Sequence, residues 1–226
     1  MKKLLFLLSF VFVSCSGDDS SDATSGSAAG KLRRYSYPTG FETYYYDNDG
    51  RISAYAEREY GSVIDSGVFV FSENKLTRIK HYENGIYRQG EDAVFEYEGT
   101  RITKRTSVES GITIERLYTY DNAGQLISDS QYDNGVLYAT TNYNYANNGN
   151  ISSISSTDGY QSGPITYDDK KNPFYYMMPE SFAKAAPTSR NNILSEGNTI
   201  YSYQYNSQNF PVTATENGTN VSFEYY

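Results

Sequence analysis

The fold is decided by the stretch Tyr118-Thr119-Tyr120-Asp121-Asn122-Ala123-Gly124-Gln125-Leu126, which holds a strand end, a tight turn and the start of a returning strand. Two aromatic residues two positions apart, Tyr118 and Tyr120, lie on the same face of a strand. Asp and Asn tolerate the left-handed backbone region and Gly accepts a positive φ, so residues 121–124 are predicted to turn. Leu126 then begins the returning strand.

Copies of this pattern recur along the chain. They lie at 44–52, 69–76, 95–102, 118–126, 143–151, 165–170, 203–210 and 223–225. The second aromatic of each copy falls at 46, 71, 97, 120, 145, 167, 205 and 225, so the spacings are 25, 26, 23, 25, 22, 38 and 20 residues. Self-similarity at a nearly fixed period indicates a repeat architecture.

A second turn lies in the middle of each repeat. Its copies are Glu83-Asn84-Gly85, Glu109-Ser110-Gly111, Asp133-Asn134-Gly135 and Thr157-Asp158-Gly159. Asn-Gly between strands is a strong hairpin signal, so each period contains two strands and two turns. The chain is therefore predicted to be all-β, an antiparallel meander of about 14–16 strands. A sheet that long must curl, split or close like a barrel.

One long spacing interrupts the repeats near 173–195. Here a short helix is predicted over 180–186, with Pro179 near its start and Pro187 ending it. Long insertions in a repeat fold often carry function. The interpretation we favour is that this insertion packs over an open end of the sheet and protects an edge. It would then bury four side chains, those of Phe174, Met177, Met178 and Phe182.

The copies resemble the YD repeat of the RHS family, whose core reads Tyr-x-Tyr-Asp-x-x-Gly-x-Leu. Residues 118–126 fit this core fully, 44–52 fit with Ile in place of Leu, and the resemblance covers about 35–226. RHS repeats in large toxins form β-hairpin shells that enclose cargo, but this chain is too short to enclose a protein. It is more similar to short YD-repeat lipoproteins of Bacteroidota, a resemblance that implies no particular activity.

The first residues are predicted to be a signal peptide, residues 1–14. A basic start with Lys2 and Lys3 precedes an apolar run over 4–13, which would span roughly 15 Å as a helix and is too short to cross a bilayer. Phe12-Val13-Ser14-Cys15 resembles the lipobox of bacterial lipoproteins, in which the cysteine is lipidated. Cys15 is the only cysteine in the chain, so we expect it to carry the anchor. The alternative is an ordinary secretory signal that leaves Cys15 as a free thiol.

Residues 15–30 have the composition of a flexible linker, and residues 31–226 would form the YD-repeat-like domain. Asp18 and Asp19 resemble the surface-export signal of Bacteroidota lipoproteins. That resemblance implies an outer-membrane location with the domain facing the cell exterior. The alternative is that both aspartates only solubilise the linker.

The charge of the chain argues against some partners. Its formal net charge is −8, and loss of Lys2 and Lys3 with the signal peptide would leave 17 basic and 27 acidic residues, or −10. Nucleic acid is therefore not expected as a partner, because phosphate contacts require a basic surface. An acidic chain is also not drawn to anionic lipid, so the membrane contact is expected through the lipid on Cys15.

Most catalytic chemistry lacks its residues here. The single histidine, His81, is expected to be a surface residue, so no Ser-His-Asp triad is supported. Zinc would need a Cys/His cluster, and no phosphate-binding glycine loop is present, so no metal or cofactor is expected. Residues 47–50 (Asp-Asn-Asp-Gly) are better explained as a β-turn than as a calcium loop. The spatial pairing of two carboxylates is the one catalytic arrangement that the sequence leaves open.

We therefore expect a non-catalytic protein that binds a glycan or a protein ligand. The motive is the abundance of Tyr, 25 in all, together with Asn and Asp on a curved sheet. The alternative is a structural or assembly component of the envelope without a small ligand, and a glycan hydrolase comes third. Outward rows of aromatic side chains would favour ligand binding, and inward packed rows would favour a scaffold.

Overall fold

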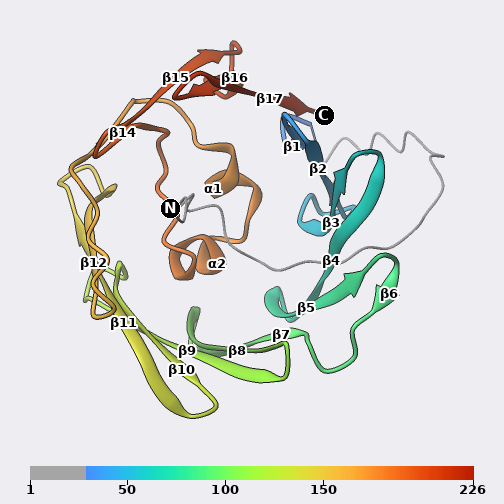
Figure 1. Ribbon diagram of the computed structural model, residues 1–226, viewed down its shortest axis with the longest axis vertical. Helices are drawn as coiled ribbons and strands as arrows, with labels where there is room; N and C mark the ends of the chain where they lie inside the picture. The colour runs from blue at the N-terminus through green and yellow to red at the C-terminus, as the bar shows by residue number, and fades with distance from the viewer. Residues whose placement is uncertain (1–28) are drawn as a thin grey trace.

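Each repeat folds as two antiparallel strands, and neighbouring strands pair into a nearly closed, barrel-like ring (Figure 1). The computed structural model describes residues 29–226. The predicted signal peptide 1–14, Cys15, the Asp18-Asp19 pair and most of the 15–30 linker lie outside the described residues. The first strand begins at Leu32.

The described residues form seventeen strands and two short helices. The strands are β1 Leu32–Tyr37, β2 Gly40–Tyr46, β3 Ile52–Glu59, β4 Ser62–Ser72, β5 Lys75–Glu83, β6 Ile86–Tyr87, β7 Ala93–Glu98, β8 Arg101–Glu109, β9 Ile112–Tyr120, β10 Leu126–Asp133, β11 Val136–Tyr145, β12 Ile151–Ser156, β13 Ile165–Tyr167, β14 Ile193–Glu196, β15 Thr199–Tyr205, β16 Pro211–Glu216 and β17 Thr219–Tyr225. The all-β antiparallel class is confirmed. The expected 14–16 strands become seventeen in part because β6 is a two-residue strand.

The ring comes together where its first and last strands meet. β1 pairs with β2 on one side and with β17 on the other. Because the chain runs up and down, successive turns lie at opposite ends of the ring. We call them the repeat-turn end, with the turns 47–50, 121–124 and 146–149, and the hairpin end, with the turns 60–61, 84–85, 110–111, 134–135 and 217–218.

Both kinds of turn follow from their residues. At the repeat-turn end, Asp47 Oδ1 accepts hydrogen bonds from the amides of Asp49 and Arg51, and Gly50 has φ +75°. The β-turn interpretation of 47–50 is therefore confirmed. At the hairpin end, Asn134 and Gly135 have φ of 48° and 80°, the two positive values of a type I′ hairpin turn.

The aromatic pair of each repeat faces the inside of the ring. The first aromatic is buried in most copies, as with Tyr44 and Phe95. The second often bonds to a neighbouring strand, since its hydroxyl donates to a backbone carbonyl at the start of the strand that follows a repeat turn. These bonds join Tyr97 to Leu76, Tyr120 to Ile102, Tyr145 to Leu126 and Tyr225 to Pro211, at 2.7–2.9 Å. The inward-facing aromatic side chains are thus packed in the core, and several are held by hydrogen bonds to a neighbouring strand.

The insertion lies inside the ring rather than over a sheet edge (Figure 1). It forms α1 Pro173–Met177 and α2 Glu180–Ala185, so the helix predicted near 180–186 is confirmed and α1 is an addition. Asn172 caps α1 by accepting from the amide of Phe174, with Pro173 at the first helical position. Within residues 29–226, no helix has the length and apolar character to cross a membrane.

The prediction that the insertion covers a sheet edge is wrong about its location, but the predicted burial of its apolar side chains is confirmed. Met177 and Phe182 are buried, and Phe174 and Met178 are half-buried against the same core. The strands curl into a ring in which β1 pairs with β17, and the insertion fills the inside of this ring (Figure 1). We call α1, α2 and the segment 186–192 the plug.

Candidate functional site

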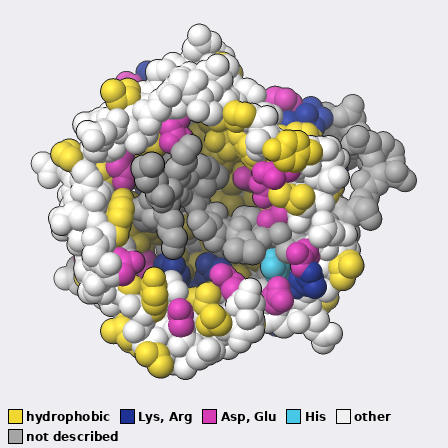
Figure 2. Space-filling model, viewed as in Figure 1, with side chains coloured by type: hydrophobic (Ala, Val, Ile, Leu, Met, Phe, Trp, Pro, Cys, Tyr) yellow, Lys and Arg dark blue, Asp and Glu magenta, His cyan; other side chains and the backbone are white. Residues whose placement is uncertain are grey.

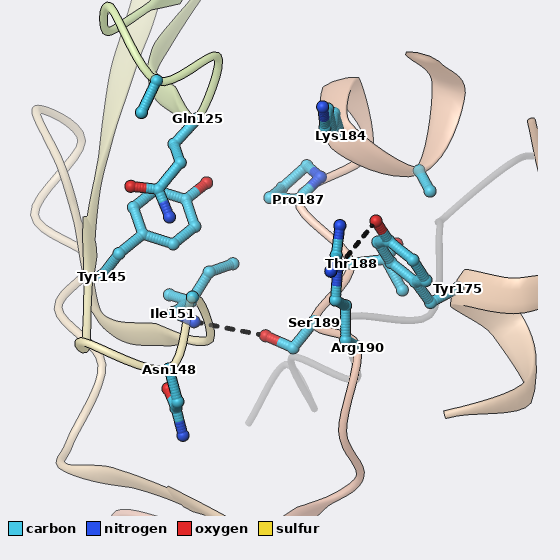
Figure 3. A pocket seen from close by; sticks show the side chains of 13 residues that line it. Gln125, Tyr145, Asn148, Ile151, Tyr175, Lys184, Pro187, Thr188, Ser189 and Arg190 are labelled. Carbon is cyan, nitrogen blue, oxygen red and sulfur yellow. Dashed lines mark hydrogen bonds between the residues drawn. The ribbon is translucent and has the colours of Figure 1, made fainter. Parts of the chain in front are cut away.

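A pocket opens at the repeat-turn end, between the plug and the wall of the ring (Figure 3). Its volume is about 370 Å³, within the range of small-ligand sites. One wall comes from the β9–β10 and β11–β12 turns and the strand ends beside them. The other wall comes from the plug, which follows some 40 residues later in the chain. A hydrogen bond from the Asn150 side-chain amide to Asn191 Oδ1 joins the two segments.

The ring wall of the pocket presents one tyrosine and two amide side chains. They belong to Tyr145, Gln125 and Asn148 (Figure 3). The Tyr145 hydroxyl donates to the Leu126 carbonyl, which fixes the ring, and burial raises the pKa of this tyrosine to about 12. Asn148 Oδ1 accepts from the amide of Asn150, which orients its side chain at the turn.

The floor of the pocket is fixed by Ser189. Its hydroxyl accepts from the Ile151 amide at 3.3 Å (Figure 3). The same hydroxyl donates to the Tyr167 hydroxyl at 3.0 Å. Its carbonyl accepts from the side-chain amide of Asn172 at 2.9 Å. Because these bonds reach the ring and the first turn of the plug, the two walls keep their spacing without a ligand.

The plug wall carries two cationic side chains, Lys184 and Arg190. Arg190 Nε donates to the Tyr175 hydroxyl at 3.0 Å, and its guanidinium carbon lies 5.3 Å from the centre of that ring. This hydrogen bond raises the pKa of Arg190 further above its usual range. Glu180 is the nearby counter-ion, 3.1 Å from Lys184 Nζ and 3.7 Å from Arg190 Nη2. Among the described residues, none that lines the pocket is acidic.

A second group of polar side chains lies on the inner face of the ring toward the hairpin end. Glu42 and Glu57 are directly opposite each other on β2 and β3. Tyr44 donates to Glu42, and Tyr37 donates to Glu57. Burial, then repulsion from Glu57, raises the pKa of Glu42 to about 7, although the Tyr44 bond opposes the rise. This is the carboxylate pair that the sequence leaves open.

Buried charges continue around the same face. Asp129 is 3% exposed in its side chain and accepts from Arg116 Nη1 at 2.9 Å and from the Tyr143 hydroxyl at 2.6 Å. Arg105 lies beside them, and burial lowers the pKa of its guanidinium. Acidic side chains are visible around the mouth of the ring in Figure 2.

The expectation that His81 is a surface residue is wrong. The residue is in β5 as predicted, but its side chain is only 12% exposed, with Nδ1 3.3 Å from a Glu91 carboxylate oxygen. The register explains this, since His81 lies opposite Gly67 on the inner face of the sheet.

Some of these groups could be predicted from the sequence. Glu42 and Tyr44 are two positions apart, so strand alternation alone places them on one face. The insertion that interrupts the repeats indicated the segment that forms the plug wall. The ring wall of the pocket could not be predicted, because only closure of the ring brings residues 123–151 beside residues 183–190.

Comparison with known proteins shows a likeness of fold. No family model matches this chain, and no curated protein matches it. A crystal structure of a porin-like protein from Bacteroides uniformis matches with a TM-score of 0.60 at 15% identity, over 88% of this chain and 98% of the other. At that identity the likeness concerns the fold alone, and the fold is compatible with the YD-repeat resemblance, which stays a prediction.

A second match is to a chain of the Tc holotoxin pore from Photorhabdus luminescens. The alignment has 16% identity and covers 78% of this chain and 11% of the other. Its TM-score of 0.28 is too low to indicate a shared fold.

Proposed function

We propose that this chain is a lipid-anchored outer-membrane protein of the cell surface that binds a glycan, without catalysis, in the pocket between plug and ring. The observation that carries the proposal is the pocket itself. It combines tyrosine rings with amide and hydroxyl groups on a rigid frame, the mixture that suits a sugar's faces and hydroxyls. Gln125, Asn148 and Thr188 supply polar groups at its walls.

Because the repeat aromatics pack inward, we place the proposed binding site in the pocket and not on the face of the sheet. Most of these rings are packed in the core and cannot stack on a sugar, so the strands serve mainly as a scaffold, and Tyr145 is the repeat aromatic that lines the pocket. The same packing supports the alternative, a structural or assembly component of the envelope. Recovery of one stoichiometric protein partner from membranes, with no glycan bound, would favour that alternative.

Binding is tested by titrating the full chain, purified in detergent, with a panel of neutral and acidic oligosaccharides in a calorimeter. Tyr175→Ala is expected to weaken binding about tenfold, because it removes an aromatic wall of the pocket. Tyr138→Ala is the matched control, since Tyr138 is exposed on β11 away from the pocket and should leave the affinity unchanged.

Two results would contradict the proposal. The first is that no oligosaccharide of the panel binds. The second is the appearance of new reducing ends during the titration, which would indicate hydrolysis and direct attention to Glu42 and Glu57.

Membrane attachment is a separate prediction. Cys15→Ser, expressed in a bacterium that processes lipoproteins, is expected to move the protein from the membrane fraction to the soluble fraction. The physical reason is that acyl chains supply the anchor, at about 0.8 kcal/mol for each buried methylene. Fractionation and immunoblotting measure the shift, with Ser16→Ala as the control. Retention of the Cys15→Ser protein in membranes would show that the lipoprotein interpretation is wrong.

A further inference from the structure

We infer that the pocket recognises an acidic sugar, with Arg190 and Lys184 binding the carboxylate of a uronic or sialic acid unit. The inference rests on the proposed glycan-binding function and adds the chemical class of the ligand. Its basis is the placement of charge on the plug wall.

The charge of the pocket is opposite to that of the chain. The whole sequence holds 27 acidic and 19 basic residues. Yet the described residues that line the pocket include two cations and no carboxylate. A concave site with cations on one wall attracts an anion and strengthens its hydrogen bonds, because the walls exclude part of the water.

Arg190 is held ready for such a ligand. The Tyr175 hydroxyl takes the Nε hydrogen, and the Tyr175 ring lies beside the guanidinium plane (Figure 3). Of the terminal nitrogens, Nη2 lies 3.7 Å from the Glu180 carboxylate, an ion pair longer than a hydrogen bond. A fixed guanidinium binds a carboxylate through two parallel hydrogen bonds and loses little conformational entropy in doing so.

Glu180 occupies the position of the ligand's carboxylate on the plug side. It contacts both Lys184 and Arg190, at 3.1 and 3.7 Å. Its side chain is 63% exposed, so it can rotate into water at little cost when another carboxylate arrives. The exchange leaves no buried charge unpaired. The rest of the sugar then meets Tyr145, Gln125 and Asn148 on the ring wall.

The test compares matched pairs of ligands on the full chain in detergent. The pairs are the acidic and carboxyl-reduced forms of trigalacturonate, of a hyaluronan tetrasaccharide and of sialyllactose. At least one acidic member is expected to bind about tenfold more tightly than its neutral partner, with a preference that falls as salt rises. The preference should fall in Arg190→Gln, which leaves Lys184 as the remaining cation, while binding of the neutral member stays within about twofold.

Two further variants sharpen the result. Glu180→Gln removes the competing carboxylate and is expected to tighten acidic binding by about threefold. Arg33→Gln changes the same charge beside Tyr226, outside the pocket, and should have no effect. If neutral sugars bind as well as their acidic partners, or if Arg190→Gln keeps the full preference, the inference is wrong and the glycan-binding function stands. If no sugar binds, the proposed function fails as well.

Discussion

Replacing Phe182 with Ala is expected to lower the free energy of unfolding by about 4 kcal/mol, the largest effect of any single truncation in the plug. Phe182 is 3% exposed and meets the Phe95 ring edge-on, with the ring centres 5.5 Å apart. The cavity left by the missing ring would lie between the plug and the barrel-like wall. The ring cannot close on it, since its circumference is set by strand pairing.

The measurement is urea denaturation followed by circular dichroism, for the wild type and both variants. Tyr176→Ala is the matched control, because Tyr176 belongs to the same plug and is 44% exposed. Its expected cost is below about 1 kcal/mol. Phe182→Ala should also weaken ligand binding, since α2 carries Lys184 and leads into the pocket wall. A loss of stability no greater than the control's would mean that the plug is not part of the core.

The repeats could be predicted because their information is local. Tyr118 and Tyr120 fix a strand face, and Asp121 to Gly124 fix a turn, whatever the rest of the chain does. The position of the insertion could not be predicted in this way. Phe182 and Met177 indicate burial, but nothing in their spacing says whether they meet a sheet edge or the inside of a ring. That depends on the closing pair of β1 and β17, which lie almost 200 residues apart.

The same distinction applies to the sites. Strand alternation predicts that Glu42 shares a face with Tyr44, and the intervening turn sets the register that pairs Glu42 with Glu57. Burial of the pair follows only from closure, as does burial of His81. The pocket is the extreme case: the insertion indicates its plug wall, but only closure of the ring brings the other wall beside it.

Glu42→Gln is expected to make the protein about 3 kcal/mol more stable than the wild type at pH 8, and to make little difference at pH 4. Burial and the neighbouring Glu57 raise the pKa of Glu42 from 4.5 to about 7 in the folded state. Between these values the folded chain holds a proton that the unfolded chain releases. The contribution of Glu42 to stability therefore falls as pH rises across this window, and it is unfavourable above it.

Glutamine resembles the protonated acid and stays neutral at every pH, so the variant does not lose stability as the pH rises. The quantity to measure is the difference in unfolding free energy between variant and wild type, by urea denaturation at intervals from pH 4 to pH 8. Glu98→Gln is the control, since it makes the same change at an exposed carboxylate at the end of β7. A Glu42→Gln difference that is flat, or that favours the wild type at pH 8, would show that Glu42 is ionised without cost in the folded ring. The carboxylate pair would then be an ordinary solvated one, and the inner face toward the hairpin end would be open to water rather than a buried polar layer.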